Sequence, residues 1–241
     1  MDGQFYSKRI EVKSMRTLTD PIPRYEAVRQ VIETGILPAV KLNEELDMVP
    51  YFQAMWEEGV RVVEITTTSV GAYERFEALS NHFAGKLLFA AGTVLDANTA
   101  REVIRRGCAV VVSPAMVPEV IETAHTYGAA CFIGAFSATE CLGAMRAGAD
   151  MVKIFPAALG GPKYMANLRM VYPDLALVPS GGINLENAGD FIRYGASAVS
   201  GARSFFDVEQ VKEKGEEWIR DQMRSYLSVV AEARELAAPL P

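Results

Sequence analysis

Eight short apolar segments, rich in β-branched residues, recur along the chain and alternate with amphipathic segments. Most of the amphipathic segments stop at a glycine, a residue that suits the left-handed position after a helix. Strands that are apolar on both faces and separated by helices indicate a parallel sheet, and eight such units predict a closed (β/α)8 barrel. The predicted strands span residues 36–42, 61–68, 87–94, 109–115, 130–136, 151–157, 176–182 and 198–203.

Helices are predicted between these strands, for example over residues 43–58, 98–106 and 118–127, each directly before a glycine. An open, doubly wound sheet is the alternative architecture. It is disfavoured because no Gly-x-Gly-x-x-Gly motif follows the first strand and because eight units favour closure.

Two further helices are predicted outside the repeat. The breakers Pro21 and Pro23 introduce one over residues 24–34, which we expect to cover the bottom of the barrel. Helical periodicity with many charges over residues 208–236 predicts a C-terminal helix with a solvated face. We therefore expect one α/β domain, with an N-terminal arm over residues 1–23, the barrel over 24–206 and a helical segment over 207–241.

The composition excludes several classes of protein. The chain has 241 residues, 50% of them hydrophobic, which is enough to bury one large core. Its net charge of −6 comes from scattered acidic and basic residues, so it has no electrostatic footprint for nucleic acid or an anionic membrane. Small molecules or copies of the same chain are the expected partners.

The cysteines and histidines point to neither a disulfide framework nor a metal site. Cys108, Cys131 and Cys141 lack paired or metal-ligand spacing, and the only histidines are His82 and His125. No apolar stretch approaches the roughly 20 residues that span a bilayer, and residues 1–16 lack the apolar core of a signal peptide. The expectation is a cytoplasmic protein.

Lys153 stands inside an apolar strand, in the segment Met-Val-Lys-Ile-Phe-Pro-Ala. Apolar surroundings disfavour an ammonium, and an amine that loses its proton near neutral pH is a nucleophile. This pattern predicts Schiff-base chemistry. The alternative is a lysine that ends a strand and reaches solvent, or that pairs with a carboxylate.

Polar residues gather at the predicted carboxyl ends of the strands, where barrels of this type hold their active sites. They are Glu64 with Thr66, Thr67 and Thr68; Gly92 with Thr93; Ser113 with Pro114; Lys153; Ser180 with Gly181 and Gly182; and Ser200 with Gly201, Ala202 and Arg203. The glycines after the last two strands predict an anion site, such as one for phosphate, built from backbone N–H groups. A tight strand-to-helix turn is the simpler explanation for a glycine pair alone.

Six motifs resemble one known family over roughly residues 36–206. They are Gly-Val-Arg-Val-Val-Glu-Ile-Thr (59–66), Ala-Gly-Thr-Val-Leu (91–95), Val-Ser-Pro (112–114), Val-Lys-Ile-Phe-Pro-Ala (152–157), Leu-Gly-Gly-Pro (159–162) and Pro-Ser-Gly-Gly-Ile-Asn (179–184). Their order and spacing resemble the 2-keto-3-deoxy-6-phosphogluconate (KDPG) and 4-hydroxy-2-oxoglutarate (KHG) aldolase family of class I pyruvate aldolases. The resemblance implies a lyase of the Entner-Doudoroff type that needs no metal and no organic cofactor, and a homotrimer.

The resemblance also implies roles for individual residues. Lys153 matches the Schiff-base lysine, and Glu64 matches the general acid and base, for which the alternative is a strand-end salt bridge. The substrate is expected to be a KDPG-like phosphosugar acid or 4-hydroxy-2-oxoglutarate, cleaved to pyruvate and glyceraldehyde 3-phosphate or glyoxylate. Further substrate-binding positions are Thr66, Gly92, Thr93, Pro114, Phe155, Ser180, Gly181, Gly182 and Gly201.

Two positions depart from the family pattern. Thr68 stands where the family has an arginine that grips the substrate carboxylate, so another cation is needed, and Lys41 is the candidate. An ordinary exposed strand-end lysine is the alternative for Lys41. Arg203 stands where the phosphosugar aldolases have a serine, and it suits either a phosphate or a distal carboxylate. Both departures remain compatible with an anionic substrate.

Two other functions are consistent with the same residues. One is a phosphate-binding barrel enzyme that uses Glu64 and Lys153 for isomerisation or another proton transfer without an iminium. The other is an inactive homologue that retains only the ligand pocket.

Overall fold

Eight parallel strands form a nearly closed barrel in the computed structural model, which describes residues 23–236. The strands are β1 (Ile36–Val40), β2 (Val62–Thr66), β3 (Leu88–Gly92), β4 (Val110–Val112), β5 (Ala130–Ala135), β6 (Met151–Ile154), β7 (Leu177–Pro179) and β8 (Val199–Gly201). Their order is β7-β6-β5-β4-β3-β2-β1-β8, and a bridge between Ser180 and Ser200 joins β7 to β8. All eight predicted strands are confirmed. They are shorter than predicted because the polar and glycine residues at their carboxyl ends turn into loops.

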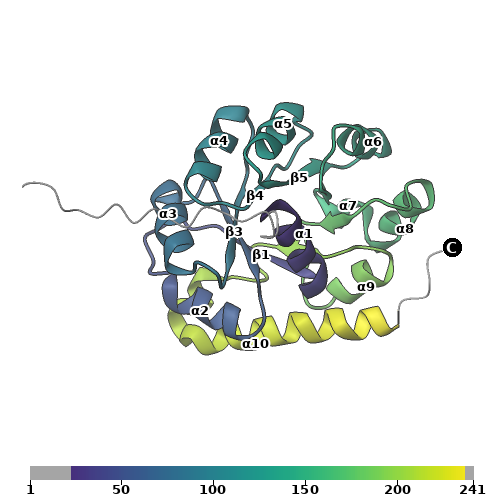
Figure 1. Ribbon diagram of the computed structural model, residues 1–241. Coiled ribbons are helices and arrows are strands. Elements are labelled where there is room, and N and C mark those ends of the chain that lie inside the picture. Colours follow the sequence, from purple (N-terminus) through teal and green to yellow (C-terminus); the bar gives the residue numbers. More distant parts are fainter. Residues whose placement is uncertain (1–22, 237–241) are drawn as a thin grey trace, which may run out of the picture.

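Helices surround the strands, as Figure 1 shows in a view along the barrel. They are α2 (Val49–Glu57), α3 (Ala72–His82), α4 (Ala97–Arg105), α5 (Pro118–Thr126), α6 (Ala138–Arg146), α7 (Ala157–Gly160), α8 (Pro162–Val171) and α9 (Ala188–Arg193). The helix predicted over 43–58 begins later, at Val49, because Pro50 occupies its first turn and favours a helix start there.

Helix α1 (Pro23–Thr34) lies across the amino-terminal end of the barrel, in front of the strands in Figure 1. Ala27 and Val31 are buried in the same apolar cluster as the side chains of the barrel interior. The Arg24 Nε donates to Asp150 Oδ1, just ahead of β6, at 2.7 Å. The predicted bottom helix is therefore confirmed. The predicted arm over residues 1–23 lies, apart from Pro23, outside the described residues.

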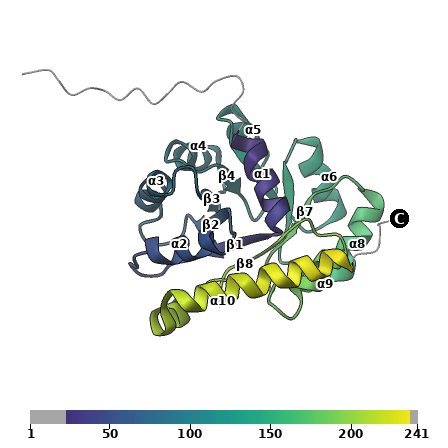
Figure 2. The ribbon, with the colours of Figure 1, turned by 60° about the horizontal axis from the view of Figure 1, so that its bottom comes forward.

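Helix α10 (Val208–Glu235) runs along the outside of the barrel against α2 and α9 (Figure 2). Gly215 interrupts it with a non-helical backbone. Arg220 pairs with Glu57 at 2.6 Å, and Arg224 pairs with Glu58 at 2.8 Å. The predicted C-terminal helix is therefore confirmed. Some of its charged residues form ion pairs that hold it against α2. Between Pro23 and Leu236, no helix combines the length and the apolar character needed to cross a membrane.

Side chains of the strands alternate between the barrel lumen and the layer under the helices. Twelve buried residues form the lumen cluster, among them Leu37, Val110, Phe132, Met151 and Val178. Alternation on β6 therefore turns Lys153, two residues after Met151, into the lumen. On β2, the same alternation turns Glu64 inward, two residues after Val62.

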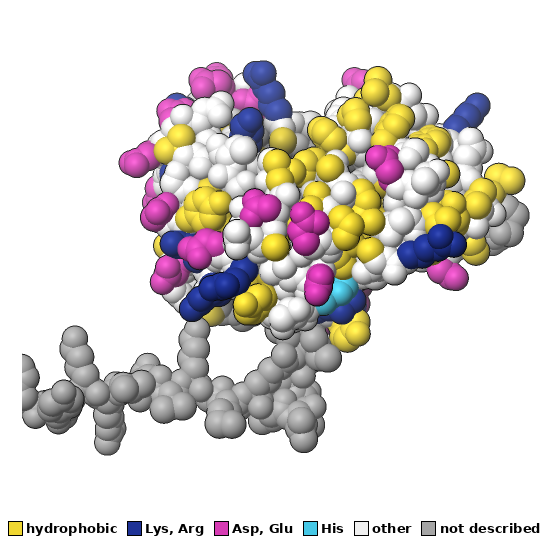
Figure 3. Space-filling model, turned by 90° about the horizontal axis from the view of Figure 1, so that it is seen from above, with side chains coloured by type: hydrophobic (Ala, Val, Ile, Leu, Met, Phe, Trp, Pro, Cys, Tyr) yellow, Lys and Arg dark blue, Asp and Glu magenta, His cyan; other side chains and the backbone are white. Residues whose placement is uncertain are grey.

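The outer surface carries charges of both signs. The face drawn in Figure 3 shows acidic and basic side chains interspersed with apolar ones, without a continuous block of one sign. This agrees with the scattered charges of the sequence and gives that face no strong electrostatic character.

Candidate active site

Glu64 and Lys153 form a buried pair inside the barrel. Lys153 Nζ lies 3.2 Å from Glu64 Oε1 and 3.3 Å from Glu64 Oε2. Counted over the whole residue, Glu64 is 1% exposed and Lys153 7%. Burying two charges is costly, so a pair of this kind outside a functional site would be unusual. An acid and a base at this distance can exchange a proton directly.

Small residues surround the pair on the side nearer the barrel mouth. A Cβ built on Gly92 would lie 2.1 Å from Glu64 Oε1. A Cβ on Gly134 of β5 would lie 2.0 Å from the carbonyl carbon of Pro114. Gly92 therefore leaves room for the Glu64 carboxylate, and Gly134 leaves room for the loop after β4, which carries Pro114.

Thr93 directly follows β3 with a left-handed backbone, at φ 61°, which is uncommon for a residue other than glycine. The Thr67 hydroxyl donates to the Thr93 carbonyl at 3.0 Å and ties the loops after β2 and β3 together. The strained backbone redirects the chain at the mouth of the barrel, next to Gly92, as is typical of functional loops.

Phe155 stands at the mouth beside the glycine turn that follows β7. Gly181 and Gly182 have φ of 83° and 85°. A Cβ on Gly181 would lie 3.0 Å from Phe155 Cε2, and one on Gly182 would lie 2.5 Å from the Ala158 Cβ. The turn also accepts backbone hydrogen bonds from the first two residues of α7, at Ser180 O and Gly181 O. Both glycines are thus required by backbone conformation and by close packing.

Gly201, in contrast, has a packing role in this structure. A Cβ there would lie 2.8 Å from Ser204 Oγ and from the Phe205 ring. The glycine that ends β8 therefore makes room for the loop that leads into α10.

The Thr68 hydroxyl belongs to a chain of side-chain oxygens after β2. It donates to Thr66 Oγ1 at 3.2 Å, and Thr66 Oγ1 lies 3.1 Å from Ser69 Oγ. Ser69 Oγ in turn accepts from the Leu42 N–H at 3.0 Å, which fastens the loop to the end of β1. Thr66 and Thr68 are thus brought together, and Ser69 is their anchor.

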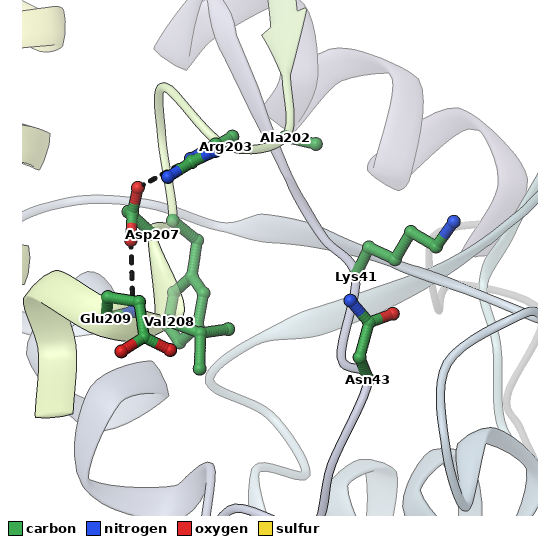
Figure 4. Close-up of a pocket in the computed structure, with 8 residues that line it drawn as sticks. Lys41, Asn43, Ala202, Arg203, Asp207, Val208 and Glu209 are labelled. Carbon is green, nitrogen blue, oxygen red and sulfur yellow. Dashed lines mark hydrogen bonds and ion pairs between the residues drawn. The ribbon is translucent and has the colours of Figure 1, made fainter.

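Lys41 and Arg203 share a pocket of about 340 Å³ at the ends of β1 and β8. Its lining consists of Lys41, Asn43, Ala202, Arg203, Phe206, Asp207, Val208 and Glu209. The Arg203 Nε pairs with Asp207 Oδ2 at 2.9 Å, and its side chain is 87% exposed. Figure 4 shows the Lys41 side chain pointing away from this pair. The Arg203 guanidinium is thus already paired with a carboxylate, and its hydrogen bond lowers the pKa of Asp207.

Neither histidine belongs to the mouth. His82 is the last residue of α3 and packs against Phe83, and His125 bonds Asp150 at 3.0 Å near the start of β6. Among residues 23–236, no group of three or more His, Cys, Asp or Glu side chains is arranged to hold a metal ion.

Comparison with known proteins identifies the family. A sequence profile described as "KDPG and KHG aldolase" matches residues 28–221. The chain belongs to the KDPG and KHG aldolase family. Its relatives carry aldolase names, so this member is an aldolase, a lyase of carbon–carbon bonds.

Two relatives show how far the likeness to this family extends. The 2-dehydro-3-deoxy-phosphogluconate aldolase of Treponema pallidum is 34% identical over 171 residues, which cover 70% of this chain and 80% of the relative. The 2-dehydro-3-deoxy-6-phosphogalactonate aldolase of Escherichia coli is 31% identical over 178 residues, covering 73% and 87%.

Solved structures of the same family superpose well on the barrel. The Legionella pneumophila KDPG aldolase, with pyruvate captured as a covalent carbinolamine, has a TM-score of 0.75 at 25% identity and covers 81% of this chain and 96% of its own. A native KDPGal structure has a TM-score of 0.76 at 28% identity, covering 83% and 96%.

Sequence reasoning missed the roles of two polar residues of this family member. Ser69 anchors the hydroxyl chain after β2, and Ser200 is buried in the lumen near the end of β8. Ser69 had a signal in the run of four hydroxyl residues from Thr66. Ser200 had only its strand-end position, which does not tell whether its side chain faces the lumen.

Proposed function

We propose that this aldolase is a class I enzyme in which Lys153 forms a Schiff base with a 2-oxo acid and Glu64 moves the protons. One observation carries the proposal: Lys153 Nζ lies 3.2 Å from Glu64 Oε1 in a buried site that opens toward the carboxyl ends of the strands. The covalent pyruvate adduct of the Legionella relative supports the same chemistry.

The steps follow from the geometry of the pair. Glu64 accepts a proton from the Lys153 ammonium, and the free amine attacks C2 of the substrate to form a carbinolamine. Protonation by Glu64 lets the former carbonyl oxygen leave as water, and an iminium remains. Glu64, now a carboxylate, takes the proton of the C4 hydroxyl while the iminium draws the electrons of the C3–C4 bond. The C4 fragment departs as an aldehyde, and an enamine remains on Lys153. Glu64 then protonates the enamine at C3, and water releases pyruvate from Lys153.

The proposed substrate is an anionic 2-oxo-3-deoxy acid. The names of the relatives favour a 6-phosphorylated gluconate or galactonate derivative, and 4-hydroxy-2-oxoglutarate is the shorter alternative. Gly92 and Thr93 would hold the pyruvate half, between Pro114 and Phe155. Ser180 and the Gly181–Gly182 turn would receive the distal anion.

The substrate carboxylate needs a cation in place of the family arginine. We assign it to Lys41, since Thr68 is bound to Thr66 and Arg203 to Asp207. A homotrimer is proposed from the family resemblance, and light scattering on the purified protein tests it.

Borohydride trapping tests the proposed chemistry. The protein is incubated with pyruvate and sodium borohydride, and the adduct is mapped by peptide mass spectrometry. We expect one adduct on Lys153 in the wild type and in Lys163→Ala, which removes an exposed-helix lysine of α8, and none in Lys153→Ala. No adduct in the wild type at saturating pyruvate would refute the Schiff base and favour proton-transfer chemistry or an inactive binding protein.

A substrate panel then distinguishes the candidates. Phosphorylated and unphosphorylated 2-oxo-3-deoxy acids and 4-hydroxy-2-oxoglutarate are compared by kcat/KM, with pyruvate release as the readout. A preference for the phosphorylated compounds supports the distal anion site, and a preference for hydroxy-oxoglutarate assigns the shorter dicarboxylate.

A further inference from the structure

Ser200 is a buried polar residue that the mechanism above does not use. It lies on β8, is 0% exposed, and its Oγ has no hydrogen-bond partner among the described residues. Buried hydroxyl groups are almost always hydrogen-bonded, so an unpartnered one calls for an explanation. In an active site, such a group can serve a state that forms only during turnover.

The strand pattern turns Ser200 into the barrel lumen. Ala198, two residues earlier, belongs to the lumen cluster, and alternate residues of a strand share one face. Ser200 pairs in register with Leu37 of β1, another lumen residue, and with Ser180 of β7. The unpartnered hydroxyl therefore faces the interior that contains the Glu64–Lys153 pair.

Lumen side chains of an eight-stranded barrel stack in layers of four, each layer supplied by alternate strands. The strand registers, with the tilt of such barrels, put four residues of the even-numbered strands in one layer: Glu64, Val112, Lys153 and Ser200. Glu64 and Lys153 come from opposite strands and meet across the lumen at 3.2 Å. Val112 and Ser200 flank the pair, so Ser200 is the layer's one neutral polar side chain.

Formation of the Schiff base changes the hydrogen bonds of the pair. The Lys153 ammonium has three N–H donors, and both Glu64 oxygens lie within reach of Nζ. Once Nζ is doubly bonded to substrate C2, it retains a single hydrogen. The Glu64 carboxylate thus loses hydrogen-bond donors of Lys153. This loss comes at the stage where Glu64 must transfer a proton to C3 and, in the reverse direction, take a proton from C3.

We propose that Ser200 is a positioning residue whose hydroxyl donates a hydrogen bond to the Glu64 carboxylate while Lys153 is held as the iminium. The inference rests on the proposed function, because it requires a Schiff base on Lys153. It explains why a hydroxyl without a partner in the free protein lies in the layer of the acid and the base. It assigns Ser200 to the proton-transfer steps and not to formation of the adduct.

Exchange of the pyruvate methyl hydrogens tests the proposal, because that exchange requires enamine formation and proton transfer at C3. Methyl exchange in D2O is followed by NMR for the wild type, Ser200→Ala and Ser200→Thr, across pH 5 to 9. Ser80→Ala is the matched control, since it removes another unpartnered buried hydroxyl, on α3 outside the lumen. Borohydride trapping is measured in parallel on every variant.

We expect Ser200→Ala to form the Lys153 adduct but to exchange about tenfold more slowly, the loss of one hydrogen bond to a charged group. Its pH profile should also shift, because Glu64 loses a donor. Ser200→Thr should restore exchange, and Ser80→Ala should match the wild type. If Ser200→Ala fails to fold, Ser200→Cys, of similar size and with a weak donor, is expected to show the slow exchange.

The outcomes separate this proposal from the function on which it rests. If Ser200→Ala forms the adduct, exchanges at the wild-type rate and keeps the wild-type pH profile, the proposed role of Ser200 is overturned and the Schiff-base function stands. Slow exchange in Ser200→Thr equal to that of Ser200→Ala would also overturn it, since the hydroxyl would then be irrelevant. Absence of an adduct in the wild type would overturn both proposals.

Discussion

Gly92 of β3 provides the space that the Glu64 carboxylate occupies. A Cβ built on Gly92 would lie 2.1 Å from Glu64 Oε1 and 2.8 Å from Glu64 Cδ. Atoms in a protein interior are closely packed, so even a methyl group at this position must displace the carboxylate. The glycine of the third strand thus helps to hold the acid of the second strand against the lysine of the sixth.

Gly92→Ala is therefore expected to disable the enzyme by moving Glu64. We expect aldol cleavage and pyruvate exchange to fall about a hundredfold, the effect of misplacing a catalytic group by about 1 Å, while the protein remains folded. The matched control is Gly143→Ala on α6, where the added Cβ would lie an ordinary 3.5 Å from Met116 Cε. Wild-type kinetics in Gly92→Ala would show that the carboxylate position is not critical.

Lys41→Ala tests whether Lys41 replaces the family arginine. Lys41 lies four residues after the lumen residue Leu37, so β1 directs it toward the mouth. We expect KM for the anionic substrate to rise about tenfold with little change in kcat, as for a lost charge-assisted bond. Arg203→Ala should have a smaller effect, because Arg203 is exposed and paired with Asp207. The reverse order of effects would assign the carboxylate to Arg203.

The sequence predicted the architecture because each strand is a short apolar run bounded by glycine or polar residues. The extents of the elements were less predictable. The helical pattern extends back to Asn43, yet the helix starts at Val49, and only Pro50 marks that start. The strand ends were overestimated because apolar residues such as Val94 continue into loops that remain buried.

The chemistry of the site was predictable, and its geometry was not. Glu64 and Lys153 carry the signal in their residue types and in apolar strand context. Nothing in the sequence gives their 3.2 Å separation, because the two residues are 89 positions apart and meet only through the register of the strands between them. The two interpretations of Lys153 also proved compatible, since it is both buried and paired with a carboxylate. Ser200 was named only as a strand-end residue, because β8 has three residues, too few to reveal which face points inward.

Asp96 is expected to stabilise α4 in a pH-dependent way. Its side chain caps the helix by accepting from the Thr99 N–H at 2.8 Å, and this bond lowers the pKa of Asp96. Because the pKa of Asp96 is lower in the folded protein, the cap stabilises fully above the pKa of the unfolded chain, about 3.9. This stabilisation is lost as the pH falls through the pKa of the folded protein. Asp96→Ala should lose about 1 kcal/mol in urea unfolding at pH 7 and less below about pH 4. Asp96→Asn should keep the cap at both pH values, and an equal loss in both variants would contradict the prediction.

Asp150 joins α1 to the barrel, and its removal is expected to loosen that junction without affecting the mouth. Its side chain is 6% exposed and accepts from Arg24 Nε at 2.7 Å and from the Cys131 N–H at 2.9 Å, and it also bonds His125 Nε2 at 3.0 Å. Asp150→Ala removes the partner of all three groups, so we expect a loss of about 2 to 3 kcal/mol in urea unfolding and faster proteolysis near α1. Asp190→Ala, which breaks an exposed ion pair with Arg193, should cost less than about 1 kcal/mol. Because Asp150 lies at the opposite end of the strands from Phe155, the folded fraction of Asp150→Ala should retain wild-type kcat. Equal losses of stability in the two variants would show that the α1 junction adds no more than a surface ion pair.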